Sequence, residues 1–229
     1  MREPQAKWPL RLFERSYMSK LVTITNILGS LGTNCYTIVN QDTREAAVVD
    51  PAARADYLVK MYEEQNIKLK HILLTHGHVD HIGGVEGLKK ALPEVKVYAS
   101  SEEADVLKRP ELNLSMMFGS SMSLEADELI DGEPELEILG TKVKCIHVPG
   151  HTKGGMCYYF PEEKLLFSGD TLFNYSIGRS DFPTGDERAL MTNISEKLLT
   201  LPEDVVVYPG HNDRTTIKKE KMGNPYFAY

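Results

Sequence analysis

The sequence predicts a mixed α/β or α+β fold, and two features of its hydrophobic pattern lead to that prediction. Short apolar or alternating runs, closed by turn residues, recur along the 229-residue chain as buried and half-buried strands require. Longer segments between these runs place apolar residues at helical spacing. The second half of the chain repeats the scheme more loosely than the first, so two β-rich halves are expected.

The first half is expected to contain five strands and two helices. The predicted strands cover residues 21–27, 36–39, 46–49, 72–74 and 95–98. A helix is predicted over residues 54–65, because Leu58 and Met61 fall on one helical face. A second helix is predicted over residues 82–92, directly after a histidine-rich turn.

The second half is expected to contain five strands and one helix, the helix over about residues 187–199. The predicted strands cover residues 136–139, 143–148, 156–160, 165–167 and 205–208. Residues 110–128 join the two halves and lack a clean periodicity. Two roles stay open for the apolar side chains of this segment, an adaptable pocket wall or a cap on the core. These side chains are Met116, Met117, Phe118 and Met122.

One large domain preceded by a short extension is the expected organisation. A chain of 229 residues, 41% of them hydrophobic, can bury a sizeable core. Met18-Ser19-Lys20 resembles an ordinary start and directly precedes the first predicted strand. We therefore expect an extension over residues 1–19 and the main domain over residues 20–229. Glu3 and Glu14 argue against a transit peptide in the extension.

Charge and cysteine content argue against several classes of partner. The net charge of −7 supplies no basic patch for nucleic acid. No apolar run reaches the roughly 18–20 residues of a membrane-spanning helix. Three cysteines without Cys-x-x-Cys spacing fit neither a disulfide framework nor a thiolate zinc site. Buried thiols in a reducing cytosol are the expectation, and with it a cytoplasmic protein without nucleic-acid or membrane partners.

The most informative motif is Thr-His-Gly-His-Val-Asp-His at residues 75–81, directly after an apolar run. Side chains two residues apart in an extended segment point the same way, so His76 and His78 can bind one ion together. Asp80 and His81 lie where the chain turns and can face a second ion. A solvated loop is the competing interpretation, but four such ligand types in six positions rarely arise by chance.

Three further candidate ligands each follow an apolar run. His151 follows the predicted strand 143–148, Asp170 follows 165–167, and His211 follows 205–208. Residues at strand ends converge on one edge of a sheet, where rigid sites are built. The repeated placement therefore predicts one site made from distant parts of the chain.

These segments resemble the metallo-β-lactamase-fold hydrolases, and most closely their short glyoxalase II-type, hydroxyacylglutathione hydrolase-like branch. The matching motifs are THGHVDH (75–81), PGHT (149–152), SGDTLF (168–173), GRSDFP (178–183), YPGH (208–211) and NPYF (224–227). The segment LGTNCY (31–36) also resembles the first hairpin of that branch. The resemblance spans roughly residues 20–229 and implies a four-layer αββα sandwich.

The resemblance also implies a ligand set for two divalent metal ions. The first ion would be bound by His76, His78 and His151, the second by Asp80, His81 and His211, and Asp170 would bridge them. Imidazole and carboxylate ligands without thiolate suit Zn²⁺ and also tolerate Fe²⁺ or Mn²⁺. Asp80 is the candidate catalytic residue, since it is placed to orient the nucleophile; sequence does not separate that role from ligation.

The activity implied is hydrolysis of a small-molecule thioester by a hydroxide held between the ions. Two different activities on similar scaffolds stay open, a mononuclear-iron persulfide dioxygenase and a lactonase. A β-lactamase is disfavoured by Asp170 at the bridging position. Only 18 residues follow His211, where full-length glyoxalase II proteins carry a longer domain, so glutathione as the carrier stays open. The basic residues of this tail are expected on a solvated helix face, and the oligomeric state is left open.

Overall fold

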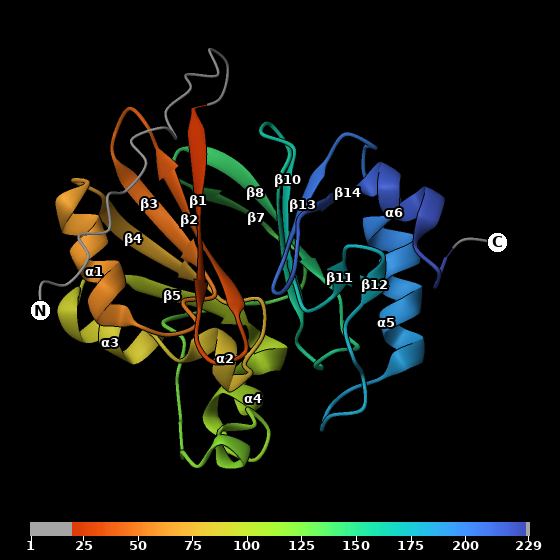
Figure 1. Ribbon diagram of the computed structural model, residues 1–229, viewed down its shortest axis with the longest axis horizontal. Helices are drawn as coiled ribbons and strands as arrows, with labels where there is room; N and C mark the ends of the chain where they lie inside the picture. Colours follow the sequence, from red (N-terminus) through yellow and green to blue (C-terminus); the bar gives the residue numbers. More distant parts are fainter. Residues whose placement is uncertain (1–19, 228–229) are drawn as a thin grey trace, which may run out of the picture.

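The computed structural model describes residues 20–227 and places two six-stranded sheets face to face, with helices on both outer faces (Figure 1). This is the four-layer arrangement predicted, and the mixed α/β class is confirmed. The expected extension over residues 1–19 lies outside the described residues. Within the described part, no helix is both long and apolar enough to cross a membrane.

The first sheet comes from the first half of the chain and has the order β1-β2-β3-β4-β5-β6. Its strands are β1 (Leu21–Leu28), β2 (Thr33–Asn40), β3 (Glu45–Val49), β4 (Lys68–Leu73), β5 (Lys96–Ser100) and β6 (Glu128–Ile130). The first three strands pair antiparallel, and β3 to β6 run parallel. Parallel strands carry their C-terminal ends to one edge, so the loops after β3, β4 and β5 emerge together.

The second sheet has the order β14-β13-β10-β9-β8-β7. Its strands are β7 (Glu135–Ile138), β8 (Thr141–His147), β9 (Met156–Phe160), β10 (Leu165–Gly169), β13 (Val206–Pro209) and β14 (Thr215–Thr216). Only β10 and β13 pair in parallel. A two-stranded ribbon of β11 (Leu172–Phe173) and β12 (Ser176–Ile177) follows β10.

Three hydrophobic clusters separate the layers. The central cluster combines residues from the facing surfaces of both sheets, among them Tyr36, Phe160 and Phe167. A second cluster lies between the first sheet and its helices, and a third lies between the second sheet and its helices. The helices are α1 (Ala55–Glu64), α2 (Val79–Ile82), α3 (Val85–Ala91), α4 (Ala104–Lys108), α5 (Glu187–Asn193) and α6 (Ile217–Gly223). All three cysteines are buried and free, as expected.

The helix predicted over residues 82–92 is instead two short helices, α2 and α3, broken at a glycine pair. A Cβ on Gly83 would lie 2.4 Å from the carbonyl oxygen of Ala52, and one on Gly84 2.5 Å from that of Pro51. Glycine is therefore needed at both positions for close approach to the loop after β3. The predicted helix over 187–199 likewise ends early, at Asn193, and continues as the single π turn η3 (Ile194–Leu198).

One of the two roles left open for the segment over residues 110–128 is seen in the structure. Met122 packs against the outer cluster of the first sheet, which is the capping role. Met116, Met117 and Phe118 form a 3₁₀ turn, η2 (Ser115–Phe118), and are 62%, 70% and 52% exposed. In the tail, Lys218, Lys219 and Lys221 lie exposed on α6, as a solvated helix face requires.

Candidate metal centre

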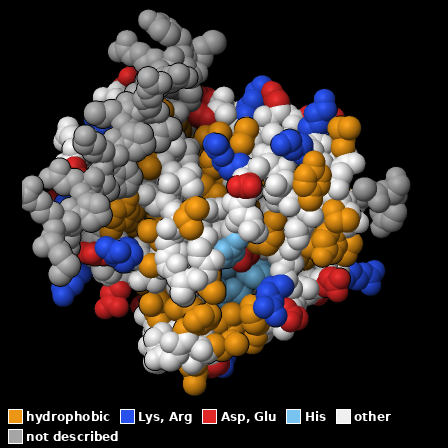
Figure 2. Space-filling model, viewed as in Figure 1, with side chains coloured by type: hydrophobic (Ala, Val, Ile, Leu, Met, Phe, Trp, Pro, Cys, Tyr) orange, Lys and Arg blue, Asp and Glu red, His pale blue; other side chains and the backbone are white. Residues whose placement is uncertain are grey.

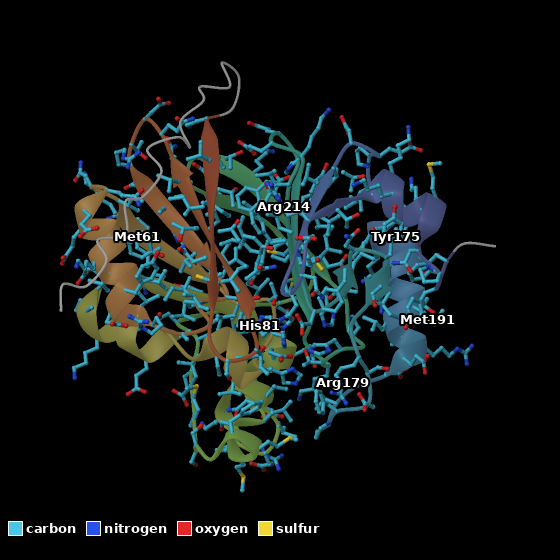
Figure 3. All side chains as sticks on the ribbon, in the orientation of Figure 1. Met61, His81, Tyr175, Arg179, Met191 and Arg214 are labelled. Carbon is cyan, nitrogen blue, oxygen red and sulfur yellow. The ribbon has the colours of Figure 1, made fainter. Side chains whose placement is uncertain are left out.

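All seven candidate ligands meet at one edge of the sandwich, between the two sheets. The loop after β4 and the helix α2 that follows it supply four of them, and the loops after β8, β10 and β13 supply one each. The prediction that strand-end residues converge is thereby matched by their positions. Figure 2 shows histidine side chains at the base of a hollow on this edge, beside a broad apolar surface, and Figure 3 places His81 near the middle of the molecule.

The first group consists of three buried histidines, His76, His78 and His151. The Nε2 atom of His151 lies 3.0 Å from Nδ1 of His78 and 3.3 Å from Nε2 of His76. Burial, reinforced by the neighbouring imidazoles, lowers the pKa of His78 to about 3 and that of His76 well below its usual range. Three uncharged rings therefore direct nitrogen lone pairs toward one point.

The second group consists of Asp80, His81 and His211. The Oδ2 atom of Asp80 lies 3.5 Å from Nε2 of His81 and 3.3 Å from Nε2 of His211. Burial opposes protonation of His211, but its hydrogen bonds to Asp170 and Asp80 outweigh burial and raise its pKa to about 9. The pKa of His81 is raised for a related reason, since the charges of Asp170 and Asp80 overcome its burial.

Asp170 lies between the two groups. Its Oδ1 is 3.4 Å from Nε2 of His81, and its Oδ2 is 3.7 Å from Nε2 of His151 and 3.5 Å from Nε2 of His211. One carboxylate therefore reaches histidines of both groups, which is the position that a bridging ligand needs.

The side-chain atoms that converge here are suited to binding a divalent cation, because some of them find no hydrogen-bond partner within the centre. Two of them, His81 Nε2 and Asp170 Oδ1, are buried without a hydrogen-bond partner among the described residues. Unpartnered buried polar atoms are rare in native proteins and call for an explanation such as an ion. The donor set is nitrogen and oxygen without sulfur, because all three cysteines lie in the hydrophobic clusters.

Asp50 orients two of the histidines and was not identified from the sequence. Its buried carboxylate accepts hydrogen bonds from the Thr75 backbone N–H (2.8 Å) and hydroxyl (2.6 Å) and contacts His81 Nδ1 at 2.9 Å. Because the Thr75 hydroxyl donates to Asp50, it is free to accept from Nδ1 of His76, 3.1 Å away. Both rings then present Nε2 to the centre. Asp50 directly follows β3, so the strand-end rule that found the other residues applied to it as well.

Glu103 is a second buried carboxylate that the sequence analysis missed. It accepts hydrogen bonds from the backbone N–H of Gly77 (2.8 Å), the Thr152 hydroxyl (2.9 Å) and the backbone N–H of Gly154 (2.9 Å). Burial raises its pKa to about 7, against the effect of these donors. Its position in the acidic run Ser101-Glu102-Glu103 gives no sequence signal that distinguishes it from a solvated residue.

The loop after β12 closes the side of the centre next to His151. Nδ1 of His151 contacts the carbonyl oxygen of Arg179 at 2.7 Å, which leaves Nε2 for the centre. Arg179 forms a two-pronged pair with Asp181, at 2.7 Å for each bond, and its guanidinium stacks on Phe182 at 3.9 Å. The Phe182 ring in turn meets His78 edge to face at 5.7 Å. Figure 3 shows Arg179 at the margin of the molecule, below and to the right of His81.

A family model described as the metallo-beta-lactamase superfamily matches residues 28–211 of the chain. The protein therefore belongs to that superfamily, as its motifs and its fold both indicate. Hydroxyacylglutathione hydrolase GloC of Haemophilus influenzae is 37% identical over 197 residues, which cover 84% of this chain and 92% of that protein. The probable metallo-hydrolase YqgX of Bacillus subtilis is 34% identical over 201 residues, which cover 87% of this chain and 94% of that protein.

Solved structures give the same result. The BLEG-1 B3 metallo-beta-lactamase has a TM-score of 0.86 at 37% identity, with 90% of this chain and 99% of that chain covered. TTHA1623 in a di-iron-bound form has a TM-score of 0.77 at 31% identity, with 89% and 99% covered. The predicted family and fold are confirmed by these likenesses.

Proposed function

We propose that the protein binds two divalent metal ions and hydrolyses a small-molecule thioester such as a hydroxyacylglutathione. The proposed ligands are His76, His78 and His151 for the first ion, Asp80, His81 and His211 for the second, and Asp170 for both. The observation that carries the proposal is the convergence of these nitrogen and oxygen donors from the ends of four strands, with His81 Nε2 and Asp170 Oδ1 buried without a hydrogen-bond partner among the described residues.

Two bound divalent ions would supply a water of lowered pKa and a Lewis acid for the carbonyl oxygen. The side chains of the protein would hold the metal ligands in position and orient the attacking water. Asp50 and the Arg179 carbonyl hold the rings of His81 and His151, and Thr33 donates a 2.9 Å hydrogen bond to Oδ2 of Asp80. That bond fixes the Asp80 carboxylate, so that one of its oxygens can orient the attacking water. We propose Asp80 as the catalytic residue on this ground.

A thioester suits these residues better than an amide does. Burial favours the neutral forms of Asp80 and Asp170, but the charge of His81 and hydrogen bonds with His211 lower the pKa of each carboxyl. Both carboxylates are therefore ionised at neutral pH, and neither can donate a proton to a leaving group. A thiolate departs without a proton, whereas an amine requires one.

Zinc is the ion we propose, and iron or manganese would suit the same ligand chemistry. The similarity to hydroxyacylglutathione hydrolase GloC supports the thioester substrate. The three buried free thiols support the cytoplasmic location that we propose. We expect a small-molecule substrate as a partner, and neither nucleic acid nor a membrane.

Asp170 at the bridging position disfavours β-lactam hydrolysis, but we keep that activity as a second candidate because the BLEG-1 B3 metallo-beta-lactamase is so similar to this chain. Thioester and β-lactam hydrolysis would use the same centre, and they differ in the leaving group. Lactone hydrolysis and persulfide dioxygenation at a single iron would also be compatible with a metal centre at this edge. The dioxygenase would hold one iron per chain and consume oxygen, which no hydrolase does.

The test is hydrolysis of S-lactoylglutathione by zinc-loaded protein, measured together with metal content, oxygen uptake and turnover of a chromogenic β-lactam. We expect two metal ions per chain and a kcat/KM on the order of 10⁴ M⁻¹s⁻¹ or above for the thioester. His81→Ala should lose both metal and turnover. His71→Ala is the matched control, since His71 contacts Tyr98 on β5 and lies outside the centre. Full turnover and full metal content in His81→Ala would exclude the proposed centre.

A further inference from the structure

Glu103 is buried beside the metal centre without a cation to balance its charge. It is 1% exposed, and no ion pair within residues 20–227 includes it. Lys153, whose charge acts on Glu103 from a distance, instead pairs its Nζ with Asp105 at 3.0 Å. Burial of a carboxylate without a cation is costly unless hydrogen bonds replace the lost water. The three hydrogen bonds that Glu103 accepts, from Gly77, Thr152 and Gly154, therefore make its burial possible.

The two oxygens of Glu103 serve two different loops. Oε1 accepts from the N–H of Gly77, the residue between His76 and His78. Oε2 accepts from the hydroxyl of Thr152, which follows His151 directly, and from the N–H of Gly154. One carboxylate thus holds the backbone on both sides of the first histidine group.

Few other contacts connect these two loops at the level of the histidines. Apart from contacts between the imidazoles, the hydrogen bonds described between residues 76–78 and residues 150–154 all pass through Glu103. Farther from the histidines, the N–H of Met156 on β9 donates a 2.8 Å hydrogen bond to the carbonyl oxygen of Thr75 and so joins the two sheets. The spacing of the histidine backbones therefore depends on Glu103.

The backbone is also shaped to admit this carboxylate. A Cβ on Gly154 would lie 2.3 Å from the backbone nitrogen of Glu103 and 2.6 Å from its Oε2. Any larger residue at this position would push the His151 loop away from Glu103. The Ser100 side chain accepts a hydrogen bond from the N–H of Glu102, which fixes the short 3₁₀ turn η1 (Ser101–Glu103).

We propose that Glu103 is a positioning residue of the metal centre: its carboxylate sets the distance between the turn of residues 76–78 and the His151 loop, and so preforms the binding site of the first ion. This inference rests on the proposed function, because it requires that His76, His78 and His151 bind a metal. Residues that hold ligands without touching the metal typically contribute 10–100-fold to metal affinity.

Glu103→Gln tests the proposal with little change in volume. Glutamine has a single acceptor oxygen, so its NH₂ group must face either the Gly77 N–H or the Thr152 and Gly154 donors. One of the two loops is then released. Binding of the first ion should weaken by about 10–100-fold, and the absorption bands of Co²⁺ at that site should change.

Glu220→Gln is the matched control. Glu220 is equally buried and also accepts three hydrogen bonds, from Thr215, Asn224 and the N–H of Tyr175. It joins α6 to the ribbon of β11 and β12, and Figure 3 places Tyr175 well to the right of His81. A loss that comes only from disturbing a buried carboxylate should appear in both variants, whereas the loss proposed here should appear in Glu103→Gln alone.

The experiment measures Zn²⁺ and Co²⁺ binding by chelator competition, the Co²⁺ spectrum, and unfolding in urea for the wild type and both variants. Wild-type affinities and spectrum in Glu103→Gln would overturn the positioning role. A wild-type protein that binds no metal would overturn the proposed function itself, so the two failures are distinct. If Glu103→Gln does not fold, Thr152→Val removes one of the three donors. Unchanged affinity for the first ion in Thr152→Val would then overturn the proposal.

Discussion

The two ligand groups of the centre differ in charge although they share one bridging position. His76, His78 and His151 are buried, and burial lowers the pKa of each, so that all three rings are neutral at pH 7. Asp80 and His211 are partly exposed, with side chains 17% and 21% accessible. Against the effect of burial, the carboxylates of Asp170 and Asp80 raise the pKa of both imidazoles in that group. The first group is thus ready to bind a cation, whereas the second holds protons that a cation must displace.

This difference has a structural origin. The first group lies between two loops that Glu103 connects, and among the described residues its only ion-pair partner is Asp170, whose Oδ2 is 3.7 Å from Nε2 of His151. The second group places His81 within 3.5 Å of oxygens from both Asp80 and Asp170. A neutral group and a charged group within one centre predict different responses to mutation and to pH.

The largest difference should appear when one histidine is removed from each group. His151→Ala deletes a buried ligand whose ring is held by the Arg179 carbonyl, and water cannot easily replace it there. We expect a loss of kcat/KM well above about 100-fold, beyond the usual effect of an indirect partner. His211→Ala should cost less, roughly 10–100-fold, because water can reach the partly exposed position. Steady-state kinetics and metal analysis of both variants check this, and equal losses would contradict the contrast between the groups.

Residues of this centre that directly follow a strand could be predicted from the sequence, whereas residues buried only by tertiary packing could not. His151, Asp170 and His211 were found because each follows an apolar strand, and the histidine motif at residues 75–81 identifies itself by composition. Asp50 satisfies the same strand-end rule, but its neighbour Pro51 makes the segment resemble an ordinary turn. Glu103 could not be predicted, since only tertiary packing against Gly77 and Gly154 buries it.

In the fold too, features that depend on distant contacts could not be predicted from the sequence. Strand positions were predicted from hydrophobic pattern, because burial dictates that pattern. The division of one predicted helix into α2 and α3 was not, because it depends on contacts with Pro51 and Ala52, about 30 residues earlier in the chain. The short strands β11, β12 and β14 also escaped prediction, since two residues carry no measurable period.

A smaller effect should follow from changing the partner of His81. In Asp50→Asn, the oxygen must stay with the Thr75 N–H, so the NH₂ group faces Nδ1 of His81. His81 then has to carry its proton on Nε2, the atom that faces the metal. We expect the affinity for the second ion to fall by about 10–100-fold and that for the first ion to fall less.

Chelator competition on Asp50→Asn separates the two affinities. Asp204→Asn provides the control, because Asp204 is an exposed partner of Lys164 outside the centre. An equal loss of affinity for both ions would mean that Asp50 acts mainly through Thr75 and His76. Asp50 would then hold ligands of both groups.

The last difference between the groups concerns protons released on metal binding. At pH 7, His78, with a pKa of about 3, has no proton to lose, whereas His211, with a pKa of about 9, is protonated in the metal-free fold. The second ion should therefore release at least about one proton more than the first. Its affinity should rise by at least roughly tenfold per pH unit between pH 7 and 9, while that of the first ion stays nearly constant.

Calorimetry in buffers of different ionisation enthalpy counts these protons, and single-group variants assign them. His211→Ala leaves the first group intact, and His151→Ala leaves the second. The same raised pKa of His211 stabilises the metal-free fold fully below about pH 6.5, and this contribution is lost as the pH rises through about 9. Bound metal replaces that proton, so the loss should disappear in the metal-loaded protein. Equal proton release by both variants would show that the two groups are electrostatically alike, and the neutral and charged halves of the centre would no longer be distinct.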